Sequence, residues 1–264
     1  MLHLLFNRFP VSVRARNGDT LTVKRLSELL NISFFWAHQL RYDVSNDMLV
    51  IPNYRDGAEV RFKGALSDGD VRSVFLLEDY SFLRLSGAVV VDIGANIGDT
   101  SIWFALNGAK KVLAFEPFPQ TYRKAQTNVI LNNLSDTISL FPAACGERDG
   151  SMLITESQEP TGNALASTAE SGIRIPVYSL SRIVHEFGIA NGVLKIDCEG
   201  CEYAVIHGAS QATLSAFRHI QIEYHQGIQN LSKVLASAGF RTRVRRIGKT
   251  LGFIYGWREL PEPE

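Results

Sequence analysis

Hydrophobic residues follow two different patterns along the chain, which divide it near residue 85. From residue 87 onward, short apolar runs alternate with segments whose apolar residues recur at helical spacing. Because repeated strand–helix units place helices on both faces of a mostly parallel sheet, this part predicts an α/β domain over residues 86–264. The expected strands are 88–93, 111–115, 138–141, 192–196 and 219–222, and the expected helices are 98–106, 119–131 and 231–238.

The end of the chain predicts two antiparallel strands, 240–247 and 251–257, joined by Gly248-Lys249-Thr250. This hairpin would add an antiparallel edge to the sheet. Strand alternation places Arg241, Arg243 and Arg245 on one face. They could bind a phosphate or an acidic sugar, but an edge strand protected by solvated charges is the simpler interpretation.

Residues 1–85 predict a small α+β cap. Alternating runs at 11–14 and 59–62 are typical of strands, the segments 17–19 and 55–57 of turns, and 22–40 of a helix. A further segment, 156–171, is rich in Ser, Thr, Ala, Gly and Glu and has no periodicity. It predicts a long loop, either functional or mobile.

Composition narrows the class of protein. The 264 residues are 45% apolar and carry 27 basic and 27 acidic side chains, so a sizeable core is expected and a general attraction to nucleic acid is not. No apolar run reaches the roughly 18–20 residues that span a bilayer, and polar residues interrupt the first ten residues, which makes them a poor signal peptide. Three cysteines give an odd count and no disulfide framework. We therefore expect a cytoplasmic globular protein in a reducing compartment.

The segment 89–98, Val-Val-Val-Asp-Ile-Gly-Ala-Asn-Ile-Gly, indicates a nucleoside site. A buried strand runs into a glycine turn and a helix, whose first amide groups are free to donate. The spacing between Gly94 and Gly98 lacks the middle glycine that admits a pyrophosphate. Glu116 follows the next strand, 22 residues after Gly94, where an acid normally accepts hydrogen bonds from a ribose. The glycines alone would fit an ordinary tight turn, but together with Asp92 and Glu116 they favour S-adenosylmethionine.

Three blocks together resemble the FkbM family of class I S-adenosylmethionine-dependent methyltransferases. They are Val-Asp-Ile-Gly-Ala-Asn-Ile-Gly (91–98), Phe-Glu-Pro (115–117) and Lys-Ile-Asp-Cys-Glu-Gly-Cys-Glu (195–202), and the resemblance covers about residues 75–245. It implies a Rossmann-like, mostly parallel seven-stranded sheet with an antiparallel last strand. It also implies O-methylation, commonly of a sugar hydroxyl, so the expected acceptor is a glycan, a glycolipid or a glycosylated small molecule.

The same resemblance implies a cofactor-binding set that follows the first three strands of the domain. Its members are Asp92, Gly94, Ala95, Asn96, Gly98, Glu116, Pro117, Phe118, Ala143 and Ala144. Residues 94–96 would line the methionine end, Glu116 would hold the ribose hydroxyls, and residues 117–118 would lie near the adenine. Residues 143–144 would lie at the adenine edge, where alanines leave recognition to backbone groups.

Candidate catalytic residues follow two later strands. Asp197 ends the strand 192–196, and Glu223 and His225 end the strand 219–222, so all three should meet at the carboxyl edge of the sheet. They could act as a base toward an alcohol or hold a divalent cation that lowers its pKa. In the alternative interpretation Asp197 caps the next helix, Glu199 balances that helix's dipole, and His225 is a surface residue.

Other functions remain open at this point. Cys198 and Cys201 form a Cys-x-x-Cys without a second ligand pair or a thioredoxin-like unit, so neither a zinc site nor a redox role is expected. An RNA methyltransferase shares the expected fold, but base-amino methylation typically accompanies Asn/Asp-Pro-Pro-Tyr/Phe where this chain has residues 197–200, Asp-Cys-Glu-Gly. A non-catalytic binding module that retains the fold is the third alternative.

Overall fold

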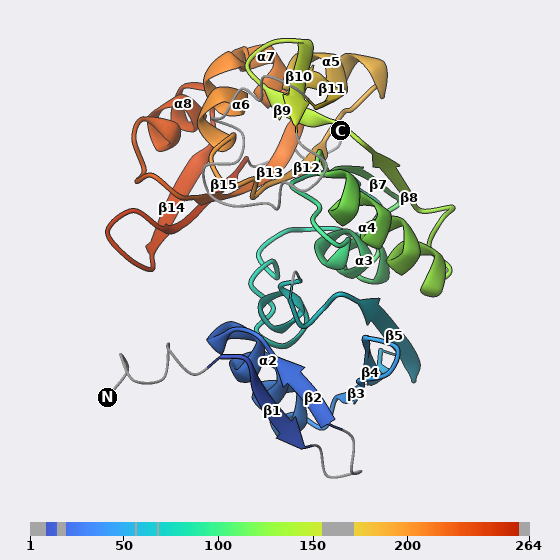
Figure 1. Cartoon of the computed structure of the whole chain (residues 1–264). Coiled ribbons are helices and arrows are strands. Elements are labelled where there is room, and N and C mark those ends of the chain that lie inside the picture. Colours follow the sequence, from blue (N-terminus) through green and yellow to red (C-terminus); the bar gives the residue numbers. More distant parts are fainter. Residues whose placement is uncertain (1–8, 15–19, 56, 68, 155–171, 259–264) are drawn as a thin grey trace.

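A computed structural model describes residues 9–14, 20–55, 57–67, 69–154 and 172–258. Its largest sheet has seven strands in the order β14-β15-β13-β12-β6-β7-β8 (Figure 1). The strands are β6 (Val89–Ile93), β7 (Lys111–Phe115), β8 (Ile138–Phe141), β12 (Gly192–Ile196), β13 (Phe217–Tyr224), β14 (Arg241–Arg246) and β15 (Gly252–Trp257). All neighbours pair in parallel except β15, which is antiparallel to β13 and β14. The structure therefore confirms the predicted Rossmann-like sheet with its antiparallel C-terminal hairpin.

Helices cover both faces of this sheet. They are α3 (Asp99–Leu106), α4 (Pro119–Leu131), α5 (Leu180–Glu186), α6 (Glu202–Gly208), α7 (Gln211–Ser215) and α8 (Leu231–Ser237). Alternate residues of β6 enter different hydrophobic clusters, Val90 with α3 and the N-terminal region and Val91 with α5 to α8. This two-sided burial explains why β6 is a continuous apolar run. Within α4, Val129 is buried but Ile130 is 66% exposed, because consecutive residues lie about 100° apart around a helix.

The N-terminal region contains two small antiparallel sheets and one helix. Its elements are β1 (Val11–Arg14), β2 (Thr20–Val23), α2 (Leu26–Ala37), β3 (Arg41–Asp43), β4 (Met48–Tyr54), β5 (Ala58–Lys63) and a π-helical turn, η1 (Arg72–Leu76). The helix expected over 22–40 starts later, because Thr20–Val23 pairs with β1. The expected turn at 17–19 and the loop at 156–171 lie outside the described residues.

Asn128 of α4 and Asn132, which follows the helix, join β5 to the part of the fold that contains the seven-stranded sheet. Asn128 accepts a hydrogen bond from the Lys63 N–H (2.7 Å) and donates to its carbonyl (3.1 Å), and Asn132 does the same with Arg61 (2.9 and 2.7 Å). Each amide thus satisfies the edge of β5 as a neighbouring strand would. Asn128 also donates to the Ile97 carbonyl (2.9 Å), and one hydrophobic cluster continues from this region into the sheet. A domain boundary near residue 85 stays a prediction.

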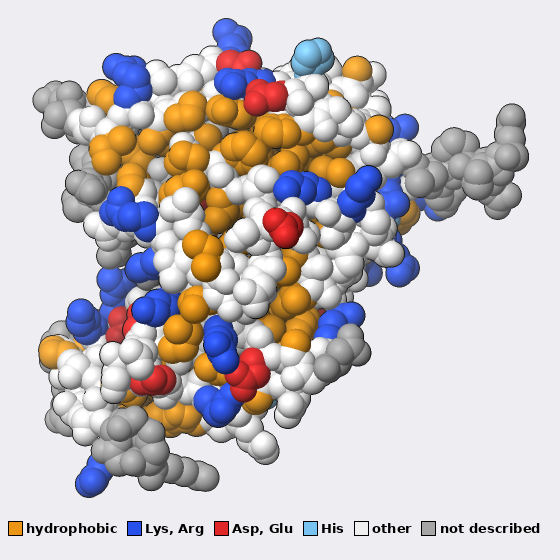
Figure 2. Space-filling model, turned by 90° about the vertical axis from the view of Figure 1, so that its right-hand side faces the viewer, with side chains coloured by type: hydrophobic (Ala, Val, Ile, Leu, Met, Phe, Trp, Pro, Cys, Tyr) orange, Lys and Arg blue, Asp and Glu red, His pale blue; other side chains and the backbone are white. Residues whose placement is uncertain are grey.

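A fourth sheet was not predicted. Its strands, β9 (Ala144–Gly146), β10 (Gly150–Ile154) and β11 (Ile173–Ser179), have the order β10-β11-β9. On the face at the right of Figure 1, hydrophobic side chains gather in a band across the upper half, and basic side chains lie interspersed with acidic ones (Figure 2). This mixture of charges agrees with the zero formal net charge of the chain.

Candidate active site

The turn after β6 is shaped by its contact with another loop. Gly94 and Ala95 both donate to the Phe115 carbonyl of β7 at 3.0 Å. Gly94 has a φ of +79°, and a Cβ atom there would lie 1.8 Å from the Asp197 carbonyl oxygen. Glycine is thus required because the backbone after β12 occupies the space of a side chain. At Gly98 the reason for glycine is the backbone conformation, a φ of +86°. Lack of space is not the reason, because a Cβ there would lie at an ordinary distance of 3.5 Å from Ala125.

A buried ion pair lies under this turn. Lys195 Nζ of β12 lies 3.0 Å from Asp92 Oδ1 of β6 and donates to the Gly94 carbonyl at 2.7 Å. Asp92 Oδ2 accepts hydrogen bonds from Thr100 Oγ1 (2.7 Å) and Ser101 Oγ (2.6 Å). Burial lowers the pKa of Lys195, but the carboxylates of Asp92, Asp197 and Asp99 together outweigh burial and raise it. Asp92, predicted as a cofactor residue, therefore holds the turn and the start of α3 in place.

Glu116 lies at the end of β7 with its carboxylate buried beside the turn. One oxygen accepts from the Asn96 N–H and the other from the Phe118 N–H, both at 2.9 Å. Burial raises the pKa of Glu116 to about 8, against the opposing effect of these two donors. In its ionised form this carboxylate offers about four acceptor sites, so two remain for a pair of ribose hydroxyls.

The residues predicted near the adenine come from two segments, 117–118 and 143–144. Phe118, which precedes α4, and Ala144 of β9 pack in one hydrophobic cluster with Ile154 and Ile175 of the fourth sheet. Ala143, which precedes Ala144, is buried, and Pro117, which precedes Phe118, is partly exposed. The sheet that was missed in the sequence therefore supplies one wall of the predicted adenine end.

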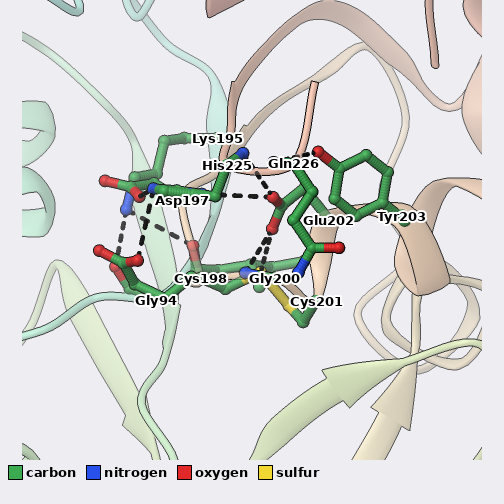
Figure 3. Close-up of polar contacts among 12 residues, drawn as sticks. Gly94, Lys195, Asp197, Cys198, Gly200, Cys201, Glu202, Tyr203, His225 and Gln226 are labelled. Carbon is green, nitrogen blue, oxygen red and sulfur yellow. Dashed lines mark hydrogen bonds and ion pairs between the residues drawn. A yellow bond between two sulfur atoms is a disulfide. The ribbon is translucent and has the colours of Figure 1, made fainter. Parts of the chain in front are cut away.

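The predicted catalytic residues also meet. His225, which follows β13, places its Nε2 atom 3.8 Å from Asp197 Oδ1 and 3.6 Å from Glu199 Oε2 (Figure 3). Both carboxylates belong to the loop of residues 197–201, between β12 and α6. The Asp197 side chain is 25% exposed and that of His225 14%, so both are partly open to solvent.

Two residues at this edge of the sheet, His225 and Glu223, have pKa values shifted from those of isolated side chains. Burial lowers the pKa of His225, but the hydrogen bond to Glu202 and the charges of Asp197 and Glu199 outweigh burial and raise it to about 9. Burial and the charge of Asp197 raise the pKa of Glu223 to about 8. At neutral pH, His225 is therefore mainly cationic and Glu223 mainly protonated.

Two residues of the site were missed by sequence reasoning. Glu202, the first residue of α6, is fully buried and accepts hydrogen bonds from His225. Glu202 is the last residue of the block 195–202, five residues after Asp197, and its place in that block was the only signal for it. Tyr80 comes from the segment before β6, and its buried hydroxyl donates to Asp197 Oδ2 at 3.3 Å. No pattern around Tyr80 distinguishes it from a core tyrosine.

The expectation that the cysteines form no disulfide is wrong. Cys198 and Cys201 are joined by a disulfide, and Cys145 is free and buried. The turn of residues 198–201 brings the two Cα atoms to 5.5 Å, which is within the range that a disulfide needs. In the sequence, the bond therefore lies between Asp197 and Glu202 and encloses Glu199, the three residues whose carboxylates lie near the His225 ring.

No group of three or more His, Cys, Asp or Glu side chains that could hold a metal ion occurs in the described residues. A cavity of about 1190 Å³ lies away from the candidate site, between α2, the sheet of β3 to β5 and the end of α4. None of the predicted site residues lines it.

Comparison with known proteins decides the family. A model of the methyltransferase FkbM domain matches residues 92–242, which is more than half of the chain. The chain belongs to the FkbM methyltransferase family. The match starts at Asp92 and includes Glu116, Asp197 and His225, so the predicted resemblance is confirmed.

Curated relatives of this FkbM domain are similar at low identity. The AMB antimetabolite synthetase AmbE of Pseudomonas aeruginosa is 27% identical in an alignment of length 225, which covers 66% of this chain and 11% of that protein. Methyltransferase 1 of Beauveria bassiana is 23% identical in an alignment of length 184, which covers 60% of this chain and 74% of that protein. The chain thus spans only about a tenth of the length of AmbE.

Solved structures that resemble the FkbM domain include the METTL16 methyltransferase domain. Its TM-score is 0.46 at 17% identity, covering 94% of this chain and 86% of that one. A precorrin-6y C5,15-methyltransferase from Geobacter metallireducens has a TM-score of 0.43 at 15% identity, covering 74% and 93%. Since both scores are below 0.5, the fold of the FkbM domain is defined here by its strand order.

Among the described residues, no helix combines the length and apolarity that a membrane crossing needs.

Proposed function

We propose that this FkbM-family methyltransferase transfers the methyl group of S-adenosylmethionine to a sugar hydroxyl of a glycan, a glycolipid or a glycosylated small molecule. The observation that carries the proposal is the contact between Asp197 and His225 at the carboxyl ends of β12 and β13. Open α/β sheets bind their ligands at this edge, and Glu116 follows β7, which β6 separates from β12 in the same sheet. An oxygen acceptor needs a group that takes its proton, and Asp197 supplies one there.

The cofactor end of the proposal rests on Glu116 and the turn after β6. Glu116 would receive the two ribose hydroxyls on the acceptor sites that the backbone leaves free. Residues 94–96 would line the methionine end, with the ion pair of Lys195 and Asp92 holding the turn from below. Phe118 and Ala144 would contact the adenine from the cluster that they share.

The acceptor end needs a proton acceptor and a counter-charge. S-adenosylmethionine supplies an electrophilic methyl group, whose carbon–sulfur bond breaks as the carbon–oxygen bond forms. Asp197 takes the hydroxyl proton, and the cationic His225 lies beside it as the counter-charge. Glu223 interacts electrostatically with both Asp197 and His225 and is a third titratable group at this edge of the sheet.

The experiment that tests the proposal identifies the methylated product. Extracts of glycans and glycolipids from cells with and without the gene are incubated with the purified protein and S-adenosylmethionine carrying a labelled methyl group. We expect the label in an ether on a sugar ring, located by fragmentation in the mass spectrometer. Label in structured RNA, together with a salt-dependent gel shift, would replace the sugar with RNA. Cofactor binding without label in either fraction would indicate a binding module.

Cofactor binding has its own test in Glu116→Ala. A hydrogen bond to a charged group contributes about 1.5–3 kcal/mol, so loss of the carboxylate should weaken S-adenosylmethionine binding at least about tenfold in isothermal titration. S-adenosylhomocysteine should lose affinity by a similar factor, and neither form of the protein should bind NAD. Unchanged affinity in the variant would place the ribose elsewhere.

A further inference from the structure

A buried carboxylate stands behind His225. Glu202 Oε1 accepts from the backbone N–H of His225 at 3.0 Å and lies 3.2 Å from its ring nitrogen Nδ1, while Oε2 accepts from the Gly200 N–H at 2.8 Å (Figure 3). The two backbone donors come from different segments, the 197–201 loop and the end of β13. These two bonds hold the Glu202 carboxylate in place independently of the orientation of the imidazole ring. The relative exposure of Glu202 is 0%.

The two nitrogens of the ring therefore face different surroundings. Nδ1 faces Glu202 in the interior, and Nε2 faces Asp197 and Glu199 at the partly open edge of the sheet. A carboxylate can only accept hydrogen bonds, so it holds the proton on the nitrogen that it contacts. We propose that Glu202 is a positioning residue that keeps Nδ1 of His225 protonated and presents Nε2 to Asp197. This inference rests on the proposed function, in which Asp197 takes the acceptor's proton.

The charges around His225 are consistent with this role. Its titratable neighbours are Asp197 and Glu199 from the loop, Glu202 from α6 and Glu223 from its own strand. Glu199 is 46% exposed and Asp197 25%, whereas Glu202 is inaccessible to solvent. Solvent screens the first two, so Glu202 is the partner whose interaction with the ring depends least on salt. When His225 loses a proton at alkaline pH, the proton leaves from Nε2.

Nuclear magnetic resonance of the whole protein tests this assignment without any acceptor. The chain is labelled with ¹⁵N-histidine, and the His225 signals are identified by their loss in His225→Asn. We expect Nε2 to titrate and Nδ1 to keep its proton when the ring becomes neutral. A neutral ring protonated on Nε2 would overturn the proposal. Since no methyl transfer is measured, this result stands apart from any failure to find a methylated sugar.

Two matched variants test the consequence for catalysis. Glu202→Gln and Glu199→Gln each remove one negative charge beside His225, but only Glu202 contacts Nδ1. We expect Glu202→Gln to lower turnover about 10- to 100-fold, the range for loss of the outer partner of a functional histidine, with little change in KM for S-adenosylmethionine. Glu199→Gln should lower turnover by clearly less. Equal losses would reduce Glu202 to one charge among several and overturn the proposal.

Folding is checked by circular dichroism and cofactor binding before the rates are compared. If Glu202→Gln does not fold, Glu202→Asp replaces it, because it keeps the charge and withdraws the carboxylate from Nδ1. We then expect the ¹⁵N spectrum of Glu202→Asp to show mixed protonation of the neutral ring. A spectrum identical to that of the unmodified protein would count against the proposal.

Discussion

Replacement of Gly94 by alanine tests how the two halves of the site are joined. The added Cβ atom would lie 1.8 Å from the Asp197 carbonyl oxygen and 2.7 Å from its carbonyl carbon. Contacts of a Cβ under 3.0 Å essentially do not occur, so the turn after β6 and the 197–201 loop must separate by at least about 1.2 Å. Both atoms belong to backbone, which cannot rotate away as a flexible side chain would.

The expected loss of stability has two parts. A left-handed φ such as the +79° of Gly94 costs a residue with a Cβ about 1–2 kcal/mol. The collision adds a further cost of the kind seen on overpacking, about 1–3 kcal/mol. We therefore expect the free energy of unfolding to fall by about 2–5 kcal/mol. Because Asp197 moves with its carbonyl, turnover should fall about 10²-fold or more, as for a 1 Å misplacement of a reacting group.

Gly98→Ala is the matched control. Gly98 ends the same turn with a φ of +86°, but its Cβ would meet only Ala125, at an ordinary 3.5 Å. We expect this variant to lose only the conformational part, about 1–2 kcal/mol, and to keep its Asp197 geometry. Urea unfolding measures both free energies, and isothermal titration measures S-adenosylmethionine binding. If Gly94→Ala costs no more than Gly98→Ala, the close approach of the two backbones does not determine the site.

Three further predictions follow from the buried and charged groups. Asp197→Asn should lower turnover about 10²-fold or more and change S-adenosylmethionine affinity less than tenfold, because it removes a proton acceptor and not a cofactor contact; full activity would make Asp197 a helix cap only. Lys195→Met leaves the carboxylate of Asp92 buried without its partner, so urea unfolding should show a loss of about 3–5 kcal/mol, and a loss under 1 kcal/mol would contradict the importance of the pair. The folded protein keeps a proton on His225 up to a pKa of about 9 and on Glu116 up to about 8, whereas the unfolded chain releases them near 6.5 and 4.5. The free energy of unfolding should therefore fall as pH rises from 6.5 to 9, and an increase over that range would show that these pKa values are not raised.

The strands and helices after residue 87 could be predicted because tertiary structure and local pattern agree there. Lys111–Phe115 and Ile138–Phe141 have the predicted bounds. Within the first of them, residues 112–115 form an uninterrupted buried apolar run, as expected of a parallel strand covered on both faces. The fourth sheet could not be predicted, because its local pattern is weak. Its strands β9 and β10 are short, and β10 mixes exposed and buried residues without strict alternation. They are strands because of pairing with β11, which no local pattern records.

The site was predictable only as far as strand ends could be located. The carboxyl ends of β12 and β13 had to meet, so the neighbourhood of Asp197 and His225 followed from the strand positions. The contact of Tyr80 with Asp197 spans 117 residues and depends on how the segment before β6 packs over the sheet. The disulfide was missed for another reason. An odd cysteine count describes the chain as a whole, whereas the geometry of one four-residue turn decides whether two neighbours join.

The arrangement of β6 and β12 gives the family's first and third sequence blocks a common physical cause. Lys195 opens the third block and crosses to Asp92 in the first, and its ammonium also holds the Gly94 carbonyl. Gly94 in turn has no side chain because the backbone of Asp197 lies against it. Asp92, Gly94 and Lys195 thus form one packed unit that sets the distance between the cofactor turn and the loop bearing Asp197. A change in any of them should therefore disturb cofactor binding and turnover together, whereas Glu202→Gln, which acts through His225, should change turnover alone.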